Sequence, residues 1–295
     1  MIINNEIKTH HSGSARRLWR GLKHNKAAML GAIVLSVLLC AAVFADFVAT
    51  RDPLKTSNET FQTPSPKFLF GTDDLGRDVF SGVVYGARTS ILIGVSVALF
   101  SGLIGVFVGA AAGYAGGFWD DFLMRLTELF LIPPRFFLVL VIAALFGGSL
   151  FNLILILTFT YWTTTARLVR AEVLSLKERP FVEASKAMGA SGARTLFREI
   201  LPNALPLIIT QMTLMVGGVI LLESALEFVG ISDAGQISWG YMLHNGQHFI
   251  RDAWWIIAFP SLTLAALVLS INVVGDALNT ALNPKTRSAY IDKAV

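Results

Sequence analysis

Long apolar runs alternate with polar segments along most of this 295-residue chain. A helix that crosses a bilayer needs about 20 consecutive, mostly apolar residues. Runs of that kind predict an all-α membrane protein with about six transmembrane helices. We place them at residues 27–49, 90–114, 122–146, 150–165, 205–229 and 254–278. The third run is irregular, because it contains Arg125, Glu128, Arg135 and the two prolines at 133 and 134.

The second run is rich in glycine. Gly105, Gly109 and Gly113 recur at every fourth position and therefore lie on one face of a helix. Small residues at this spacing let two helices approach closely in lipid. We therefore expect a close helix–helix contact along this face.

The composition agrees with a membrane protein. Hydrophobic residues make up 54% of the chain and charged residues only 15%, whereas soluble domains contain about 25% charged residues. The net charge of +4 does not indicate nucleic-acid binding, because the basic residues flank the apolar runs, where they act as topology signals. The single cysteine, Cys40, excludes a disulfide within the chain.

The distribution of Lys and Arg predicts the orientation, because these residues are enriched in cytoplasmic loops. They concentrate in the N-terminal tail, in the loop after the fourth run and in the C-terminal tail, so we expect both termini in the cytoplasm. The predicted organisation is a cytoplasmic tail (1–26), a first transmembrane helix (27–49), an extracytoplasmic segment (50–88), a transmembrane core (89–280) with a cytoplasmic loop (170–204), and a cytoplasmic tail (281–295).

The cytoplasmic loop carries local signals for two short helices. Pro180 suits the first turn of a helix, and Glu183 complements the positive end of its dipole. Gly189 is a natural C-terminal stop. Ser191 can cap a second helix, which we expect to end before Pro202. Composition alone would favour a solvated amphipathic connector.

The spacing of the loop resembles the EAA loop of binding-protein-dependent ABC importer permeases, which reads Glu-Ala-Ala, three residues, Gly, nine residues and Ile-x-Leu-Pro. Two positions depart from it: Ser185 keeps a small side chain, and Glu199 makes one edge polar. In that family the loop docks as a coupling helix onto an ATPase subunit. The resemblance implies that the ATPase-coupling residues are Glu183, Ala184, Ser185, Lys186, Ala187, Met188, Gly189, Leu201 and Pro202.

Two further stretches narrow the resemblance. Residues 70–88 begin Phe-Gly-Thr-Asp-Asp-Leu-Gly-Arg-Asp, and residues 238–246 read Ser-Trp-Gly-Tyr-Met-Leu-His-Asn-Gly. Both are similar to the second permease of the dipeptide, oligopeptide and nickel transporter subfamily, and the resemblance extends over residues 16–287. It implies an ABC type I importer permease fold in a bacterial cytoplasmic (inner) membrane.

The same resemblance implies partners: a homologous second permease, two cytoplasmic ATPase subunits, an extracytoplasmic substrate-binding protein and the lipid bilayer. The chain has no GxxxxGK[ST] phosphate-binding loop, so we expect no cofactor and no enzymatic activity of its own. ATP and Mg²⁺ would belong to the ATPase subunits. Peptides are the expected cargo, with nickel complexes, oligosaccharides and opine-like compounds as alternatives.

Ionisable residues inside apolar runs are costly and are therefore candidates for functional residues. Glu223 and Glu227 lie four residues apart on one helix face. They either face the translocation pathway and attract a cationic group, or accept hydrogen bonds from nearby loops and cap a neighbouring helix. The structural alternative is favoured.

Three other polar groups have similar alternatives. Arg125 and Glu128 are three residues apart and resemble the family's Arg-x-x-Asp arrangement; they either line the pathway or, as we favour, form an ion pair on one helix face near the cytoplasmic mouth. Arg135 either meets a substrate carboxylate or pairs within the helix bundle. His244 and His248 have a spacing that metals can use, but in an aromatic-rich loop we expect hydrogen bonding rather than a metal site.

Two other functional classes fit less well. An ion-coupled secondary transporter usually contains inverted repeats and broken helices, and the chain shows no repeat. A membrane enzyme would need catalytic residues at a recognisable spacing, and the chain contains neither HExxH nor a Ser-x-x-Lys set.

Overall fold

The computed structural model describes residues 26–231 and 235–282, and these residues are mainly helical, apart from the long segment between α4 and α5. The predicted tails at 1–26 and 281–295 fall almost wholly outside them. The helices are α3 (Lys26–Val43), α4 (Ala45–Val48), α5 (Val79–Ala115), α6 (Gly117–Leu131), α7 (Arg135–Phe146), α8 (Leu150–Lys177), α9 (Pro180–Ala187), α10 (Gly192–Arg194), the π-helix η1 (Thr195–Ile200), α11 (Leu201–Phe228), α12 (Trp239–Gly246), the 3₁₀-helix η2 (Gln247–Phe249) and α13 (Trp255–Leu282).

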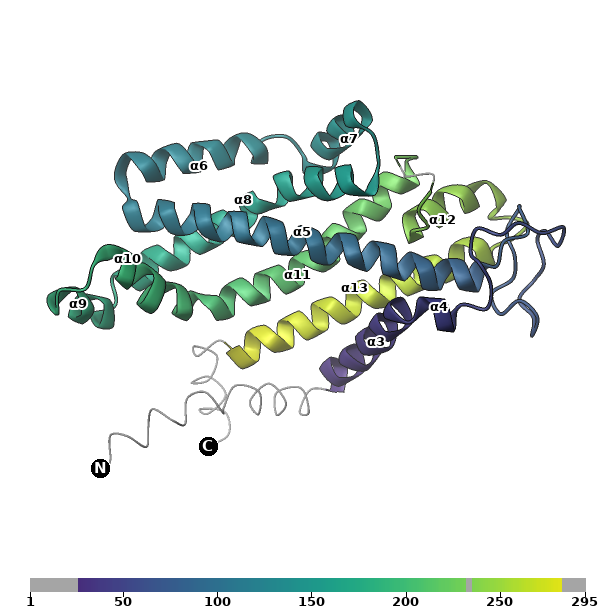
Figure 1. Ribbon diagram of the computed structural model, residues 1–295, viewed down its shortest axis with the longest axis horizontal. Helices are drawn as coiled ribbons and strands as arrows, with labels where there is room; N and C mark the ends of the chain where they lie inside the picture. Colours follow the sequence, from purple (N-terminus) through teal and green to yellow (C-terminus); the bar gives the residue numbers. More distant parts are fainter. Residues whose placement is uncertain (1–25, 232–234, 283–295) are drawn as a thin grey trace.

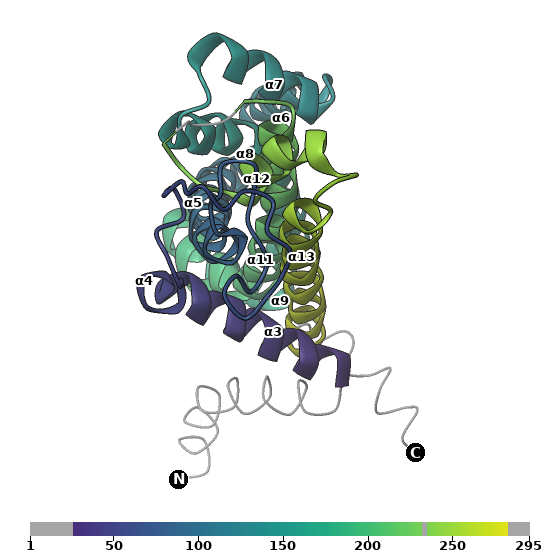
Figure 2. The ribbon, with the colours of Figure 1, turned by 90° about the vertical axis from the view of Figure 1, so that its right-hand side faces the viewer.

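The long helices α5, α8, α11 and α13 run side by side along the molecule (Figure 1). Helix α5 packs against both α8 and α11, and α13 packs against α11 and α3. Helices α6 and α7 lie on the opposite side of the bundle from α3 (Figure 2). The α9 end of the bundle carries α9 and α10, and the α12 end carries α12 and the segment between α4 and α5 (Figure 1).

Four helical stretches are long and apolar enough to cross a membrane: Lys26–Val43, Val79–Ala115, Gly192–Phe228 and Trp255–Ala281. Helices α6 and α7 would make a fifth span if they are taken together, but they are bent by 79° at the break that contains the two prolines. The predicted span 150–165 is the first part of α8 and fails the same test, because it is rich in threonine and followed closely by Arg167 and Arg170. The all-helical membrane fold is confirmed, whereas the count of about six spans stays a prediction.

Helix α5 begins earlier than the apolar pattern indicates. We expected the span at residue 90, but the helix starts at Val79, where the Asp78 side chain accepts a hydrogen bond from the Ser81 amide (2.9 Å). This N-cap satisfies a backbone donor that the first turn would otherwise leave unpaired. The search for a long apolar run missed these first turns because Arg88, Thr89 and Ser90 interrupt the run ten residues into the helix.

The glycine face of α5 packs closely on α8, as predicted. A Cβ on Gly109 would lie 2.3 Å from the Ala166 carbonyl oxygen, and one on Gly105 would lie 2.5 Å from Thr165 Cβ. Both distances are shorter than atoms can approach without displacement. These glycines therefore set the separation of the two helices that form the centre of the bundle.

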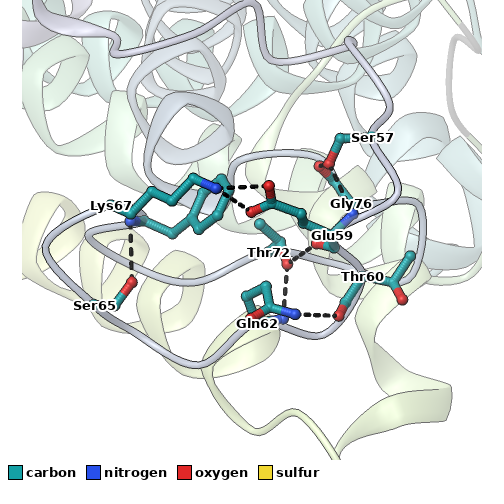
Figure 3. Close-up of polar contacts among 9 residues, drawn as sticks. Ser57, Glu59, Thr60, Gln62, Ser65, Lys67, Thr72 and Gly76 are labelled. Atoms are coloured by element: carbon teal, nitrogen blue, oxygen red, sulfur yellow. Dashed lines mark hydrogen bonds and ion pairs between the residues drawn. The ribbon is translucent and has the colours of Figure 1, made fainter.

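The segment between α4 and α5 forms a hydrogen-bonded cover on the α12 end (Figure 3). The Thr72 hydroxyl donates to the Glu59 carbonyl (2.6 Å) and accepts from the Gln62 amide (2.8 Å). The Trp255 indole donates to the Thr72 carbonyl (3.0 Å), which ties the cover to α13. The stacked rings of Phe70 and Phe259, 4.0 Å apart, add an apolar contact between the same two elements.

Candidate functional site

Helix α9 begins and ends as its sequence predicts. Pro180 occupies the first turn, together with Glu183. Gly189 has a φ of 83°, a conformation that glycine adopts without steric cost. Its amide donates to the Lys186 carbonyl (2.9 Å), and the Ala190 amide donates to the Ser185 carbonyl (3.1 Å). These two bonds close the helix in the manner of a glycine C-cap.

The two faces of α9 have different environments. Val182 is fully buried and Ser185 is 7% exposed, and Val182 packs in the apolar cluster that α5, α8 and η1 share. Serine in place of the second alanine therefore faces this chain's own bundle. The opposite face is open, and Met188, just beyond the helix, is 83% exposed.

The second predicted helix does not end before Pro202, so that prediction was wrong. Ser191 caps α10 through the Arg194 amide (3.4 Å), as expected, but α10 then continues through the π-helix η1 into α11. Proline lacks the N–H that an α-helix needs. Just before Pro202, the chain forms the wider π-helix η1, which ends at the fully buried Ile200, and α11 then starts at Leu201.

The open face of this region forms what we call the docking surface. Its exposed members are Phe181, Glu183, Ala184, Lys186, Ala187, Met188 and Phe197. Phe181, at the start of α9, is 40% exposed, and Phe197, in the π-helix η1, is 63% exposed. The sequence motif did not identify these two phenylalanines, whose signal is an aromatic residue in an otherwise polar loop. Exposed apolar side chains gathered on a short, anchored helix are typical of a protein interface.

The remaining motif positions lie at the edge of this surface. Leu201 and Glu199 are half-buried, and Pro202 is exposed. The Glu199 carbonyl accepts a hydrogen bond from the Asn203 side chain (2.6 Å). The acidic residue that replaces the motif's isoleucine is therefore half-buried and is not one of the exposed members of the docking surface.

Glu223 and Glu227 lie inside the bundle, 0% and 3% exposed. The Glu223 carboxyl group lies near the Ser90 hydroxyl of α5 (3.3 Å) and the Ser224 hydroxyl (3.1 Å). Glu227 accepts hydrogen bonds from the Ser238 hydroxyl and from the Tyr241 amide (3.1 Å), which belongs to the first turn of α12. Glu227 therefore caps a neighbouring helix, in agreement with the structural alternative.

The predicted ion pair between Arg125 and Glu128 is wrong. Both residues are exposed on α6, and no ion pair joins them in the part of the chain that the structure describes. The ion pair of α6 is instead made by Asp120, which receives two hydrogen bonds from Arg170 of α8 at 2.5 and 2.7 Å. Sequence spacing identifies pairs within one helix, whereas this pair joins residues 50 positions apart.

Arg135 pairs within the bundle. Its guanidinium group donates to the Thr164 hydroxyl (2.9 Å) and lies 4.1 Å from the centre of the Tyr161 ring. The Tyr161 hydroxyl donates in turn to the Gly218 carbonyl of α11 (3.0 Å). Arg135 thus links α7 to α8 and, through Tyr161, to α11.

His244 is a hydrogen-bonding residue, as expected. Its Nδ1 lies 2.8 Å from the Phe228 carbonyl, at the C-terminus of α11. Across residues 26–231 and 235–282, no three His, Cys, Asp or Glu side chains gather as metal ligands would.

Comparison with known proteins places these features in a family. Residues 105–288 match the family model of the binding-protein-dependent transport system inner membrane component, and residues 14–65 match the N-terminal TM domain of oligopeptide transport permease C. The chain is 40% identical to the dipeptide transport system permease protein DppC of Bacillus subtilis, over 97% of this chain and 92% of the relative.

Two more relatives are similar over comparable lengths. The oligopeptide transport system permease protein OppC of Bacillus subtilis is 37% identical, over 92% of this chain and 90% of the relative. The di/tripeptide transport system permease protein DppC of Pseudomonas aeruginosa is 35% identical, over 93% of both chains.

Proposed function

This chain belongs to the family of binding-protein-dependent transport system inner membrane components, and from that premise we propose that it carries peptides across the bacterial inner membrane as one half of an ATP-driven importer. A homologous second permease supplies the other half. Two cytoplasmic ATPase subunits bind ATP and Mg²⁺, and an extracytoplasmic binding protein delivers the cargo.

The docking surface is the observation that carries this proposal. A cytoplasmic ATPase subunit needs a rigid, accessible element to push against, and α9 fits this need. Its inner face is anchored by Val182 and Ser185, while its outer face exposes Phe181 and Met188. Burying a methionine or phenylalanine side chain in an interface contributes about 1.5–3 kcal/mol. A few such side chains are enough for a stable contact.

The structure also offers a route by which docking moves the bundle. Helix α9 packs against η1, and η1 continues without a break into α11. A displacement of α9 by the ATPase subunit therefore passes directly into α11. This helix reaches the other end of the bundle, where Glu227 binds α12. Closure of the ATPase subunits is in this way coupled to the opposite side of the membrane.

The orientation follows from the same proposal. The docking surface meets the ATPase subunits, so the α9 end is cytoplasmic, and the α12 end with its hydrogen-bonded cover is extracytoplasmic. The basic residues of the α8–α11 region support this orientation, because Lys and Arg are enriched on the cytoplasmic side. Both termini would then lie in the cytoplasm.

The peptide cargo is proposed from the relatives. The similar proteins are named for dipeptide, oligopeptide and di/tripeptide transport, and a further one, 33% identical, for D,D-dipeptides. Nickel complexes, oligosaccharides and opine-like compounds remain the alternative cargoes.

Reconstitution tests the proposal. The chain, its partner permease and the ATPase subunits are incorporated into proteoliposomes with the binding protein outside and ATP inside. We expect uptake of a labelled dipeptide, and none when the ATPase subunits carry an inactivating substitution. Uptake driven by an ion gradient without ATP would show a secondary transporter instead. ATP-dependent uptake of a nickel complex or an oligosaccharide, but of no peptide, would overturn the cargo alone.

A further inference from the structure

A small cavity lies between the start of α5 and helix α12. Its volume is about 30 Å³, and its walls include Asp78, which caps α5, and Gly82 in the first turns of α5, together with Tyr241, Met242 and Asn245 of α12. A cavity needs roughly 10–15 Å³ to hold one water molecule. This cavity therefore has room for water between the two helices.

Each of the two helices brings one buried, unpaired polar atom to the residues that line this cavity. Asp78 is 3% exposed, and its Oδ2 accepts hydrogen bonds from the Ser81 amide (2.9 Å), the Ser81 hydroxyl (2.6 Å) and the Thr50 hydroxyl (2.9 Å). Its other oxygen, Oδ1, has no hydrogen-bond partner among residues 26–231 and 235–282, and the same holds for the buried Nδ2 of Asn245. Unpaired buried polar atoms are costly, so most of them in folded proteins bind another protein group or water.

The two atoms differ in what they need. The Asp78 oxygen needs a donor, and the Asn245 nitrogen needs an acceptor. A cation would bind the oxygen but face the N–H groups of Asn245. An anion would accept from Asn245 but lie among the carboxyl groups of Asp73, Asp74 and Asp78, and the guanidinium group of Arg77, which also lines the cavity, is already bound to Asp73 (2.6 Å). Water both donates and accepts, so it satisfies both atoms.

We propose that water bound in this cavity donates to Asp78 Oδ1 and accepts from Asn245 Nδ2, and in this way joins the N-cap of α5 to α12. It adds to the direct hydrogen bond that the Trp239 indole of α12 donates to the Val83 carbonyl of α5 (2.9 Å). Helix α12 is then held on two sides, by Glu227 of α11 and through water by the start of α5. When α12 separates from α5, solvent takes the place of the bound water, so neither polar atom is left unpaired by the movement.

Electron cryomicroscopy of the assembled complex in lipid nanodiscs, at a resolution that shows other buried waters, tests the proposal. We expect density about 2.6–3.2 Å from Asp78 Oδ1 and from Asn245 Nδ2, as one peak or as two linked peaks. A cavity without density would overturn the proposal, and so would a direct hydrogen bond between the two side chains. A peak with several oxygen contacts of about 2.3–2.6 Å, typical of a calcium ion, would also overturn it.

Two variants separate water from a cation. Asp78→Asn preserves the cap, because asparagine caps helices as well as aspartate, and water can accept from two amides. The density should therefore remain in Asp78→Asn, whereas that of a cation would be lost. Asn245→Leu removes the amide and should lower the thermal unfolding midpoint by several degrees, while Asn58→Leu, at an exposed position of the cover, should leave it unchanged. Loss of the density in Asp78→Asn, or equal midpoints in the two leucine variants, would contradict the proposal.

Discussion

The two ends of the bundle differ in how their large side chains are placed. At the α12 end, two tryptophans donate hydrogen bonds to distant carbonyls: Trp239 to the Val83 carbonyl (2.9 Å) and Trp255 to the Thr72 carbonyl. At the α9 end, Phe197 and Met188 stay 63% and 83% exposed. Both ends expose some apolar side chains, Leu54 and Trp254 among them at the α12 end, but only the α9 end carries them on a short helix whose other face is anchored in the bundle.

This difference predicts that the α12 end contributes mainly to the stability of the fold, and the α9 end mainly to the contact with an ATPase subunit. Substitutions at the α12 end should cost folding free energy, because they remove contacts made within the chain. Substitutions on the docking surface should leave the fold intact and weaken the contact with an ATPase subunit. The predictions below test this division, from the largest expected effect on stability to the smallest.

The largest effect is expected at Trp239, which is fully buried at the α12 end. Trp239→Ala leaves a cavity and removes the hydrogen bond from the indole to the Val83 carbonyl, which should destabilise the protein by about 3–5 kcal/mol. Thermal unfolding of the detergent-purified complex measures the change. Trp254→Ala is the matched control, because Trp254 is 56% exposed, and it should unfold near the wild-type temperature. Equal losses in both variants would contradict the account.

The ion pair of the cover should have the next largest effect. Asp73 accepts hydrogen bonds from the Leu75 amide (3.0 Å), the Arg77 amide (2.8 Å) and the Arg77 guanidinium (2.6 Å), and both side chains of the pair are only 12% exposed. Burial lowers the pKa of Arg77, but Asp73 and Tyr241 outweigh it and leave that pKa raised, so the guanidinium stays charged.

Asp73→Ala should therefore destabilise the protein by about 3 kcal/mol, because it leaves this buried cation unpaired. Chemical or thermal unfolding of the same complex measures the loss. Asp46→Ala breaks the exposed pair with Arg88, whose side chains are 61% and 40% exposed, and should change stability little. A larger loss of stability in Asp46→Ala than in Asp73→Ala would contradict the assignment of the cover as a stabilising element.

Much of the α9 end could be predicted from the sequence, because its signals are local. Pro180, Gly189 and Ser191 act within one or two turns, and each performs its predicted role. The exception is Pro202, which does not end the helix: a π-helix precedes it, and its last residue, Ile200, is buried among residues far away in the sequence.

The α12 end could not be predicted in the same way, because its contacts join residues far apart in the chain. Trp239 binds a carbonyl 156 residues away, and the hydroxyl near Glu223 comes from Ser90, 133 residues away. No spacing rule connects such positions. The sequence identified Glu223 and Glu227 as unusual, since charges in an apolar run are costly, but it could not choose between their two roles.

A smaller effect is expected where α12 rests on α11. A Cβ on Gly240 would lie 2.7 Å from Ser224 Cα, a backbone atom that no side-chain rotation can move away. Gly240→Ala should therefore destabilise the protein by about 1–3 kcal/mol, through overpacking. In Gly218→Ala the added Cβ meets only the Tyr161 hydroxyl at 3.7 Å, an ordinary contact, so this control should not be destabilised by overpacking. Unfolding midpoints that do not distinguish the two variants would mean that α12 has room to shift.

At the α9 end, the backbone conformation of Gly189 should affect how ATP hydrolysis is coupled to uptake. A valine at a φ of 83° is strained by about 1–2 kcal/mol and should shift the end of α9. We expect Gly189→Val to insert into the membrane, to keep ATP hydrolysis in the complex and to lose uptake. Gly189→Asn is the control, because asparagine tolerates this conformation, and it should retain uptake. Normal uptake by the valine variant would show that this turn does not set the coupling geometry.

The most direct test of the division between the two ends is recovery of the ATPase subunit with a tagged form of this chain. Met188→Asp places a charge on the docking surface and should weaken ATPase binding about tenfold or more, with little change in unfolding temperature or in recovery of the partner permease. Leu54→Asp changes an exposed apolar residue of the cover and should recover the ATPase subunit normally. Normal recovery with Met188→Asp, or loss only with Leu54→Asp, would contradict the assignment of the docking surface.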